Sequence, residues 1–81
     1  MDKEKYQNDI RDLSNCVSIL ESIIYLIKSR DDYKLNYAKK AIELQQNKFS
    51  KIISQYDVTD ESIHKLINDF TSNLIIAKEL L

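Results

Sequence analysis

Hydrophobic residues recur every three or four positions along most of the chain. In residues 3–28 they form two neighbouring stripes, the pattern of an amphipathic helix that packs along its length. Because the second stripe makes the later half of this segment apolar over more than half its circumference, that half needs at least two packing neighbours. The first stripe comprises Tyr6, Ile10, Leu13, Val17, Leu20, Ile24 and Ile27, and the second comprises Cys16, Ile19, Ile23 and Leu26.

The first stripe ends at polar positions 31 and 34, and a second one follows in residues 32–56. Residues 28–32 predict a short connection in which Ser29 or Asp31 caps the next helix. No glycine ends the first helix, so one bent, nearly continuous helix is the alternative. Gln45 interrupts the second stripe, and it lies either within the helix seam, where a polar residue sets register, or at its edge. This stripe comprises Leu35, Ala38, Ile42, Gln45, Phe49, Ile52 and Tyr56.

A third helix is predicted over residues 60–80. Thr59 is its expected cap, and acidic residues at 60 and 61 complement the helix dipole. Val58 and Ile63 occupy the positions of a hydrophobic staple. The stripe comprises Ile63, Ile67, Phe70, Leu74, Ala77 and Leu81.

Glycine and proline are both absent from the 81 residues. Tight hairpins and phosphate-binding loops depend on glycine, so this composition excludes most β folds and several enzyme classes. We therefore predict one all-α domain over residues 1–81. Its architecture is an antiparallel three-helix bundle or a helical hairpin with a third packing helix. The competing architecture is an open hairpin whose missing wall another chain supplies.

The formal net charge of −1 disfavours nucleic acid as the main partner, because phosphate binding needs a basic excess. Residues 31–56 hold five lysines against three acids, while residues 57–81 hold two lysines against five acids. Attraction between neighbouring helices, or simple solvation, explains this asymmetry. No apolar stretch is long enough for a bilayer, so we expect a cytoplasmic protein with no membrane partner.

Few residues could carry chemistry. His64 follows Asp60 by one turn but has no accompanying nucleophile, so a surface histidine is the preferred interpretation. Cys16, the single cysteine, excludes an internal disulfide and is expected to be a buried hydrophobic residue. Acid pairs such as Asp9/Asp12 fit solvation and capping. The sequence predicts no enzyme, catalytic residue, metal site, cofactor or small-molecule substrate.

Apolar surface in excess of what the helix contacts need predicts a protein interface. Tyrosines at the end of the first helix and the start of the second strengthen this prediction, since tyrosine is common at interfaces; the alternative is that the rings cover the flank of the bundle. A basic stripe on the second helix is interpreted as a solvated face. The predicted interface comprises Ile19, Ile23, Tyr25, Leu26, Tyr33 and Tyr37.

In size and helical pattern the chain resembles phage or plasmid inhibitors of host machinery, bacteriocin immunity proteins and small secretion co-chaperones. This resemblance implies a protein that acts by binding another protein through an apolar and aromatic helix surface, as an anti-defence or immunity-like inhibitor does. The alternatives are a structural homodimer and a secretion co-chaperone or adaptor. A nucleic-acid binder is disfavoured.

Overall fold

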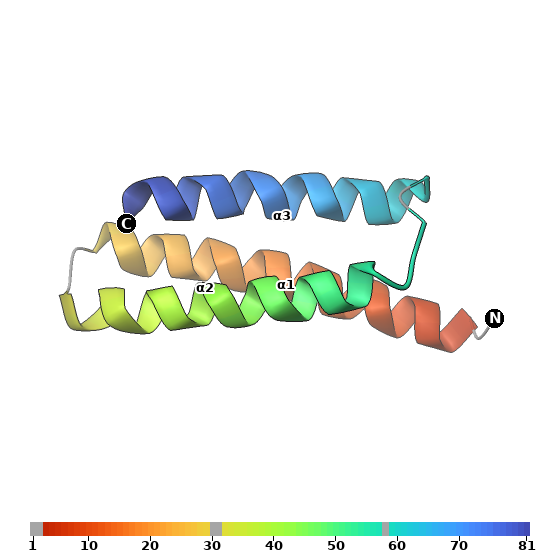
Figure 1. The fold of residues 1–81 in the computed structure, drawn as a ribbon, viewed down its shortest axis with the longest axis horizontal. Coiled ribbons are helices and arrows are strands. Elements are labelled where there is room, and N and C mark those ends of the chain that lie inside the picture. The colour runs from red at the N-terminus through yellow and green to blue at the C-terminus, as the bar shows by residue number, and fades with distance from the viewer. Residues whose placement is uncertain (1–2, 30–31, 58) are drawn as a thin grey trace.

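The computed structural model describes residues 3–29, 32–57 and 59–81, without the side chains of 32–34. Helix α1 spans Lys3–Lys28, α2 spans Asp32–Ile53 and α3 spans Glu61–Leu80, and no described residue lies in a strand (Figure 1). The prediction of an all-α three-helix bundle is confirmed. The alternative of one bent helix over the first two segments is wrong, because α2 runs back along α1.

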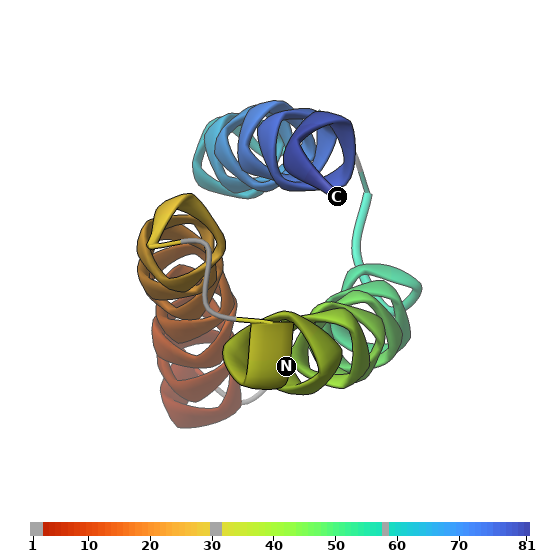
Figure 2. The same ribbon diagram turned by 90° about the vertical axis from the view of Figure 1, so that its left-hand side faces the viewer.

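Helix α1 holds the bundle together. Both α2 and α3 pack closely against it, whereas the backbones of α2 and α3 approach each other less closely (Figure 2). The apolar breadth of α1 explains this arrangement. The first stripe is buried or half-buried, and Cys16 and Ile23 of the second stripe are also buried, which a single neighbouring helix could not achieve. The molecule is a rod whose Cα positions extend over 45 × 18 × 16 Å.

The core consists of the residues that the helical periodicity selected. Leu13 and Leu20 of α1 and Ile63 of α3 are completely buried, and each contributes about 1.5–3 kcal/mol by leaving water. Gln45 is 5% exposed and so lies within the seam, which makes the interpretation that placed it at the edge wrong. The remaining buried apolar residues are Cys16, Val17, Ile23, Ile27, Ala38, Ile42, Phe49, Phe70 and Ala77.

The ends of α2 and α3 differ slightly from the prediction. Helix α2 ends at Ile53, three residues early, because residues 55 and 56 bond to the carbonyls three positions back instead of four. The cap of α3 is Asp60, whose Oδ1 accepts the Ile63 amide at 3.0 Å. Thr59 is not the cap, since its own amide donates to Asp57 Oδ1. Val58 of the predicted staple lies outside the described residues.

Of the two predicted caps of α2, Ser29 lies among the described residues. Ser29 does not face the start of α2, because its hydroxyl donates back to the Leu26 carbonyl at 2.6 Å. It therefore terminates α1. Asp31, the other predicted cap, lies outside the described residues.

Candidate functional site

Large exposed apolar side chains occur on all three helices. At the end of α3 they are Ile75, Ile76 and Leu80, followed by Leu81, and on α1 and α2 they include one stripe each. On α1, Ile19 is 39% exposed, and the half-buried Leu26 follows it after two turns. On α2, Tyr37 and Leu44 are 65% and 58% exposed and are likewise two turns apart. Residues seven positions apart lie on the same side of a helix, so each pair defines a straight apolar line.

The two stripes adjoin. Lys48 lies one turn after Leu44 and acts electrostatically on the thiol of Cys16, which lies one turn before Ile19. Since α1 and α2 are antiparallel neighbours, this proximity places Leu44 near the level of Ile19 along the rod. The half-buried Ala41 lies one turn before Leu44 and borders the core. The resulting surface, called the α1/α2 face below, comprises Ile19, Leu26, Tyr37, Ala41 and Leu44.

The predicted interface residues divide into three groups. Ile19, Leu26 and Tyr37 lie on the α1/α2 face. The prediction that places Ile23 at the interface is corrected, because Ile23 is 3% exposed and belongs to the core. It points nearer to the Leu20 and Ile27 side of α1 than Ile19 does.

The other two tyrosines do not add to this face. Tyr25 is 76% exposed, but it is six residues after Ile19 and therefore lies on another side of α1. The side chain of Tyr33 lies outside the described residues. Sequence reasoning missed Leu44, whose spacing of seven from Tyr37 is the signal that could have found it.

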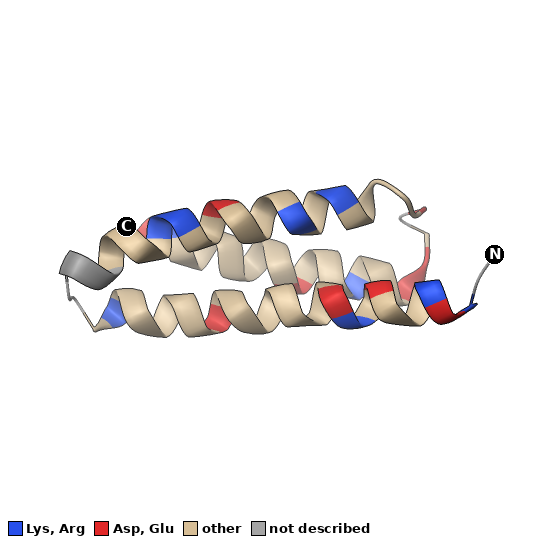
Figure 3. Ribbon diagram, turned by 90° about the horizontal axis from the view of Figure 1, so that it is seen from below, with Lys and Arg blue, Asp and Glu red and all other residues tan. Residues whose placement is uncertain are grey.

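Three lysines border the α2 part of the face. All three are exposed. They are Lys40, four residues before Leu44, Lys48, four residues after it, and Lys51, seven residues after it. Figure 3 marks the basic positions along α2 in blue. The expected attraction between these lysines and α3 is not expressed as ion pairs, because the one ion pair among the described residues joins Lys5 to Asp9.

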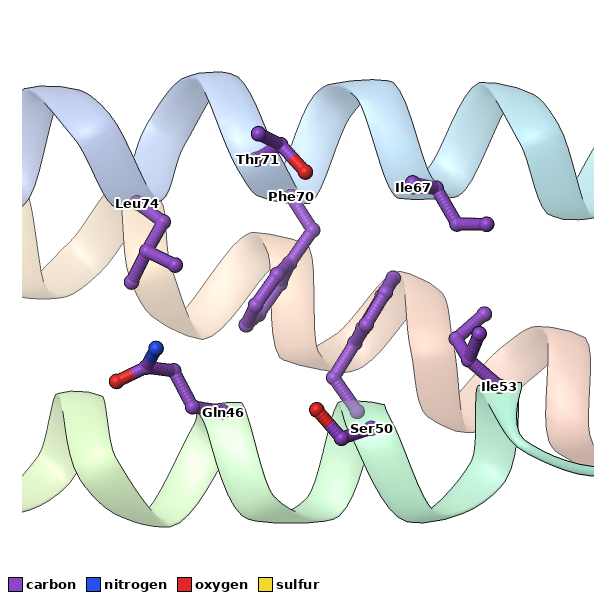
Figure 4. Close-up of a pocket in the computed structure, with 8 residues that line it drawn as sticks. Gln46, Ser50, Ile53, Ile67, Phe70, Thr71 and Leu74 are labelled. Carbon is purple, nitrogen blue, oxygen red and sulfur yellow. The ribbon is translucent and has the colours of Figure 1, made fainter.

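A second apolar region lies between α2 and α3, as a hollow of about 260 Å³ (Figure 4). Phe49 and Phe70 stack across it with ring centroids 4.0 Å apart and nearly parallel planes. Its apolar residues are all buried or half-buried, so it offers less uncovered apolar surface than the α1/α2 face does. The lining comprises Gln46, Phe49, Ser50, Ile53, Ile67, Phe70, Thr71 and Leu74.

A polar cluster ties the three helices together at the end of the bundle that holds the α2–α3 connection. The Tyr6 hydroxyl donates to Asp60 Oδ2 at 2.8 Å, and the Tyr56 hydroxyl donates to Asp9 Oδ2. Lys5 Nζ also binds Asp9 Oδ2 at 2.8 Å. The two tyrosine rings meet edge to face, with centroids 5.8 Å apart. We call these five residues the end cluster.

The electrostatics of the end cluster favour a structural tie over proton transfer. Hydrogen bonds from Lys5 and Tyr56 lower the pKa of Asp9, and those from the Ile63 amide and Tyr6 lower that of Asp60. The same bonds raise the pKa of both tyrosines. At neutral pH the carboxylates therefore stay ionised and the phenols stay protonated, which is not how a general acid–base pair is tuned.

Cys16 lies in α1 and His64 in the first turn of α3, and neither side chain is hydrogen-bonded to the end cluster within the described residues. Cys16 is buried, as expected, and burial is the main cause that raises the pKa of its thiol. A raised pKa leaves less of the reactive thiolate. His64 is exposed in the first turn of α3, and its backbone amide donates to the Asp60 carbonyl at 2.8 Å. Neither residue has the setting of a catalytic nucleophile or base.

No protein-family model, curated protein or solved structure matches the chain. Within the described ranges, no three His, Cys, Asp or Glu residues are grouped in a way that could hold a metal ion. The described parts of the three helices also lack a segment with the length and hydropathy needed to cross a bilayer.

Proposed function

We propose that this chain is a non-enzymatic binding module that docks a helix of another protein on the α1/α2 face. The observation that carries the proposal is the exposure of the apolar side chains of Ile19, Tyr37 and Leu44 on two helices that pack against each other. Contiguous exposed apolar surface is typical of interaction sites. A partner helix with apolar residues at spacings of three, four and seven fits such a surface.

Two physical features support docking rather than catalysis. Tyr37 offers a large ring that loses little conformational entropy when it is covered, which suits an interface. A chain of 81 residues also has a thin core, so a bound partner adds stability that the chain lacks alone. The groups with shifted pKa values are either buried, as Cys16 is, or held in the end cluster.

A module of this kind acts by covering a surface of its target. We therefore propose an inhibitor or adaptor role, of which phage- or plasmid-type inhibitors of host machinery are one form. Cytoplasmic residence fits this proposal, since the single free cysteine suits a reducing compartment.

Site-specific photocrosslinking in the native host tests the proposal. The full chain carries benzoylphenylalanine at position 44, and a matched control carries it at Ser72, which is exposed on α3. We expect an adduct with one other protein from position 44 and not from position 72, and we expect Ile19→Glu to abolish it. No adduct at 44, or the same adduct at 72, would overturn the proposal. An adduct of two copies of this chain would favour the homodimer instead.

A further inference from the structure

The α1/α2 face carries an uneven charge. Lys40, Lys48 and Lys51 surround Leu44 along α2, while the α1 stripe contributes one acid, Asp12, two turns before Ile19. Three lysines against one aspartate leave the face basic, although the whole chain is slightly acidic. None of the three lysines makes a hydrogen bond or an ion pair within the described part of the chain.

The charges and the apolar residues are ordered along the face. Leu26 and Tyr37 lie toward the α1–α2 connection, Ile19 and Leu44 lie in the middle, and Lys51 lies toward the other end. A ligand that covers the face must therefore be apolar along its centre. It must also place negative charge within reach of the lysines that border Leu44.

We propose that the occupant of the α1/α2 face is an acidic amphipathic helix, whose apolar stripe covers Ile19 and Leu44 while its flanking carboxylates face Lys40, Lys48 and Lys51. This inference rests on the proposed function, and it names the chemistry of the partner. Exposed charge pairs add little to affinity one by one, but they select the partner and speed its association.

The same charges disfavour the other occupants. A symmetric dimer through this face would bring two like-charged sets of lysines together, and like charges across an interface are repulsive. Single-stranded nucleic acid stacks successive bases on several aromatic rings beside a basic groove, whereas the α1/α2 face offers one ring, Tyr37, next to the aliphatic Ile19 and Leu44. An acidic helix satisfies both the apolar and the basic parts of the face.

Two designed peptides test the inference by fluorescence anisotropy. Both carry leucines at helical spacings of three, four and seven; one has glutamates beside the leucines and the other has lysines at the same positions. We expect the acidic peptide to bind about ten-fold more tightly than the basic one, because a few exposed charge pairs supply a free-energy difference of that size. We also expect the affinity of the acidic peptide to fall as the salt concentration rises.

Charge reversal then locates the effect. Lys48→Glu with Lys51→Glu should reverse the peptide preference, whereas Lys65→Glu with Lys78→Glu, at exposed positions of α3, should leave it unchanged. Circular dichroism checks that each variant remains helical. Leu44→Glu should weaken the binding of the acidic peptide.

Three outcomes would overturn the inference: equal binding of the two peptides, binding of neither, or tighter binding of a single-stranded oligonucleotide. None of these affects the crosslinking experiment at position 44. A crosslinked protein together with equal peptide binding would leave docking intact and reject only the acidic partner. Absence of the crosslink would reject docking itself.

Discussion

Gln45 lies in the middle of the α2 stripe, surrounded by apolar side chains. Its Oε1 is buried and has no hydrogen-bond partner among the described residues. A buried acceptor without a partner loses its hydration without compensation, at a cost of about 1–3 kcal/mol. We therefore expect Gln45→Met, which keeps the length of the side chain, to raise the free energy of unfolding by about 1 kcal/mol. Urea denaturation followed by circular dichroism measures this change.

The control for Gln45 is Gln7→Met at an exposed position of α1, which should change stability by less than about 0.5 kcal/mol. A Gln45→Met variant less stable than the parent would mean that the amide oxygen is satisfied in solution, for example by a trapped water. That result would give Gln45 a register-setting role in the seam.

Leu20 and Leu44 are the same residue type in opposite environments. Leu20 is completely buried in α1, so Leu20→Ala should cost about 2–5 kcal/mol through lost apolar contact and the cavity it leaves. Leu44 is exposed on the α1/α2 face, so Leu44→Ala should stay within about 0.5 kcal/mol of the parent. Thermal and urea unfolding compare the two variants, and a similar loss in both would show that Leu44 is core.

At the scale of the helix, the apolar periodicity predicted α1 and α3 almost to the residue. The burial of Leu13, Leu20 and Ile63 follows directly from their positions in the stripes. Periodicity was less informative about the flanks of a stripe. It could not decide between Ile19 and Ile23, because which of two neighbouring residues is covered depends on where α2 lies.

The end cluster could not be predicted from sequence. Tyr6 and Tyr56 belong to the predicted stripes, where an aromatic residue is expected to be buried among apolar neighbours. Their hydroxyls instead reach Asp60 and Asp9, which are 54 and 47 residues away along the chain. No local spacing encodes such a pair, because it forms only once the ends of the three helices meet.

Asp60 performs two tasks at the start of α3, which gives an element-scale prediction. Its Oδ1 accepts the Ile63 amide and its Oδ2 accepts the Tyr6 hydroxyl. Asp60→Ala removes both bonds, whereas Asp60→Asn retains a capping oxygen. We expect the alanine variant to have the lower unfolding midpoint and faster amide hydrogen exchange in the first turn of α3. Equal exchange in the two variants would argue that the cap contributes nothing.

At the scale of the whole molecule, α1 is the element on which the others depend. It packs against both α2 and α3, and the end cluster joins its first turns to the ends of both. The α1/α2 face lies farther along the rod, toward the α1–α2 connection. Substitutions in the end cluster and on the face are therefore separable, one acting on stability and the other on binding.

The end cluster makes the stability of the whole bundle depend on pH. The pKa values of Asp9 and Asp60 are lowered by folding, so their stabilising contribution is present above the unfolded pKa of about 3.9 and is lost as the pH falls through the folded values. The pKa values of Tyr6 and Tyr56 are raised by folding. The stabilising contribution of these two tyrosines is therefore present below their unfolded pKa of about 10 and is lost as the pH rises through the folded values. We expect a stability plateau between these limits.

Urea midpoints measured from pH 2.5 to 11 give the profile of the parent and of two variants. Asp9→Asn with Asp60→Asn should be less stable at pH 7 but lose less stability below pH 4, because the groups that bind protons on unfolding are gone. Tyr6→Phe with Tyr56→Phe should flatten the alkaline side and also reduce the acid loss, since each hydroxyl helps to lower an aspartate pKa. If both variants kept the acid slope of the parent, other carboxylates would control acid unfolding and the end cluster would not join the three helices energetically.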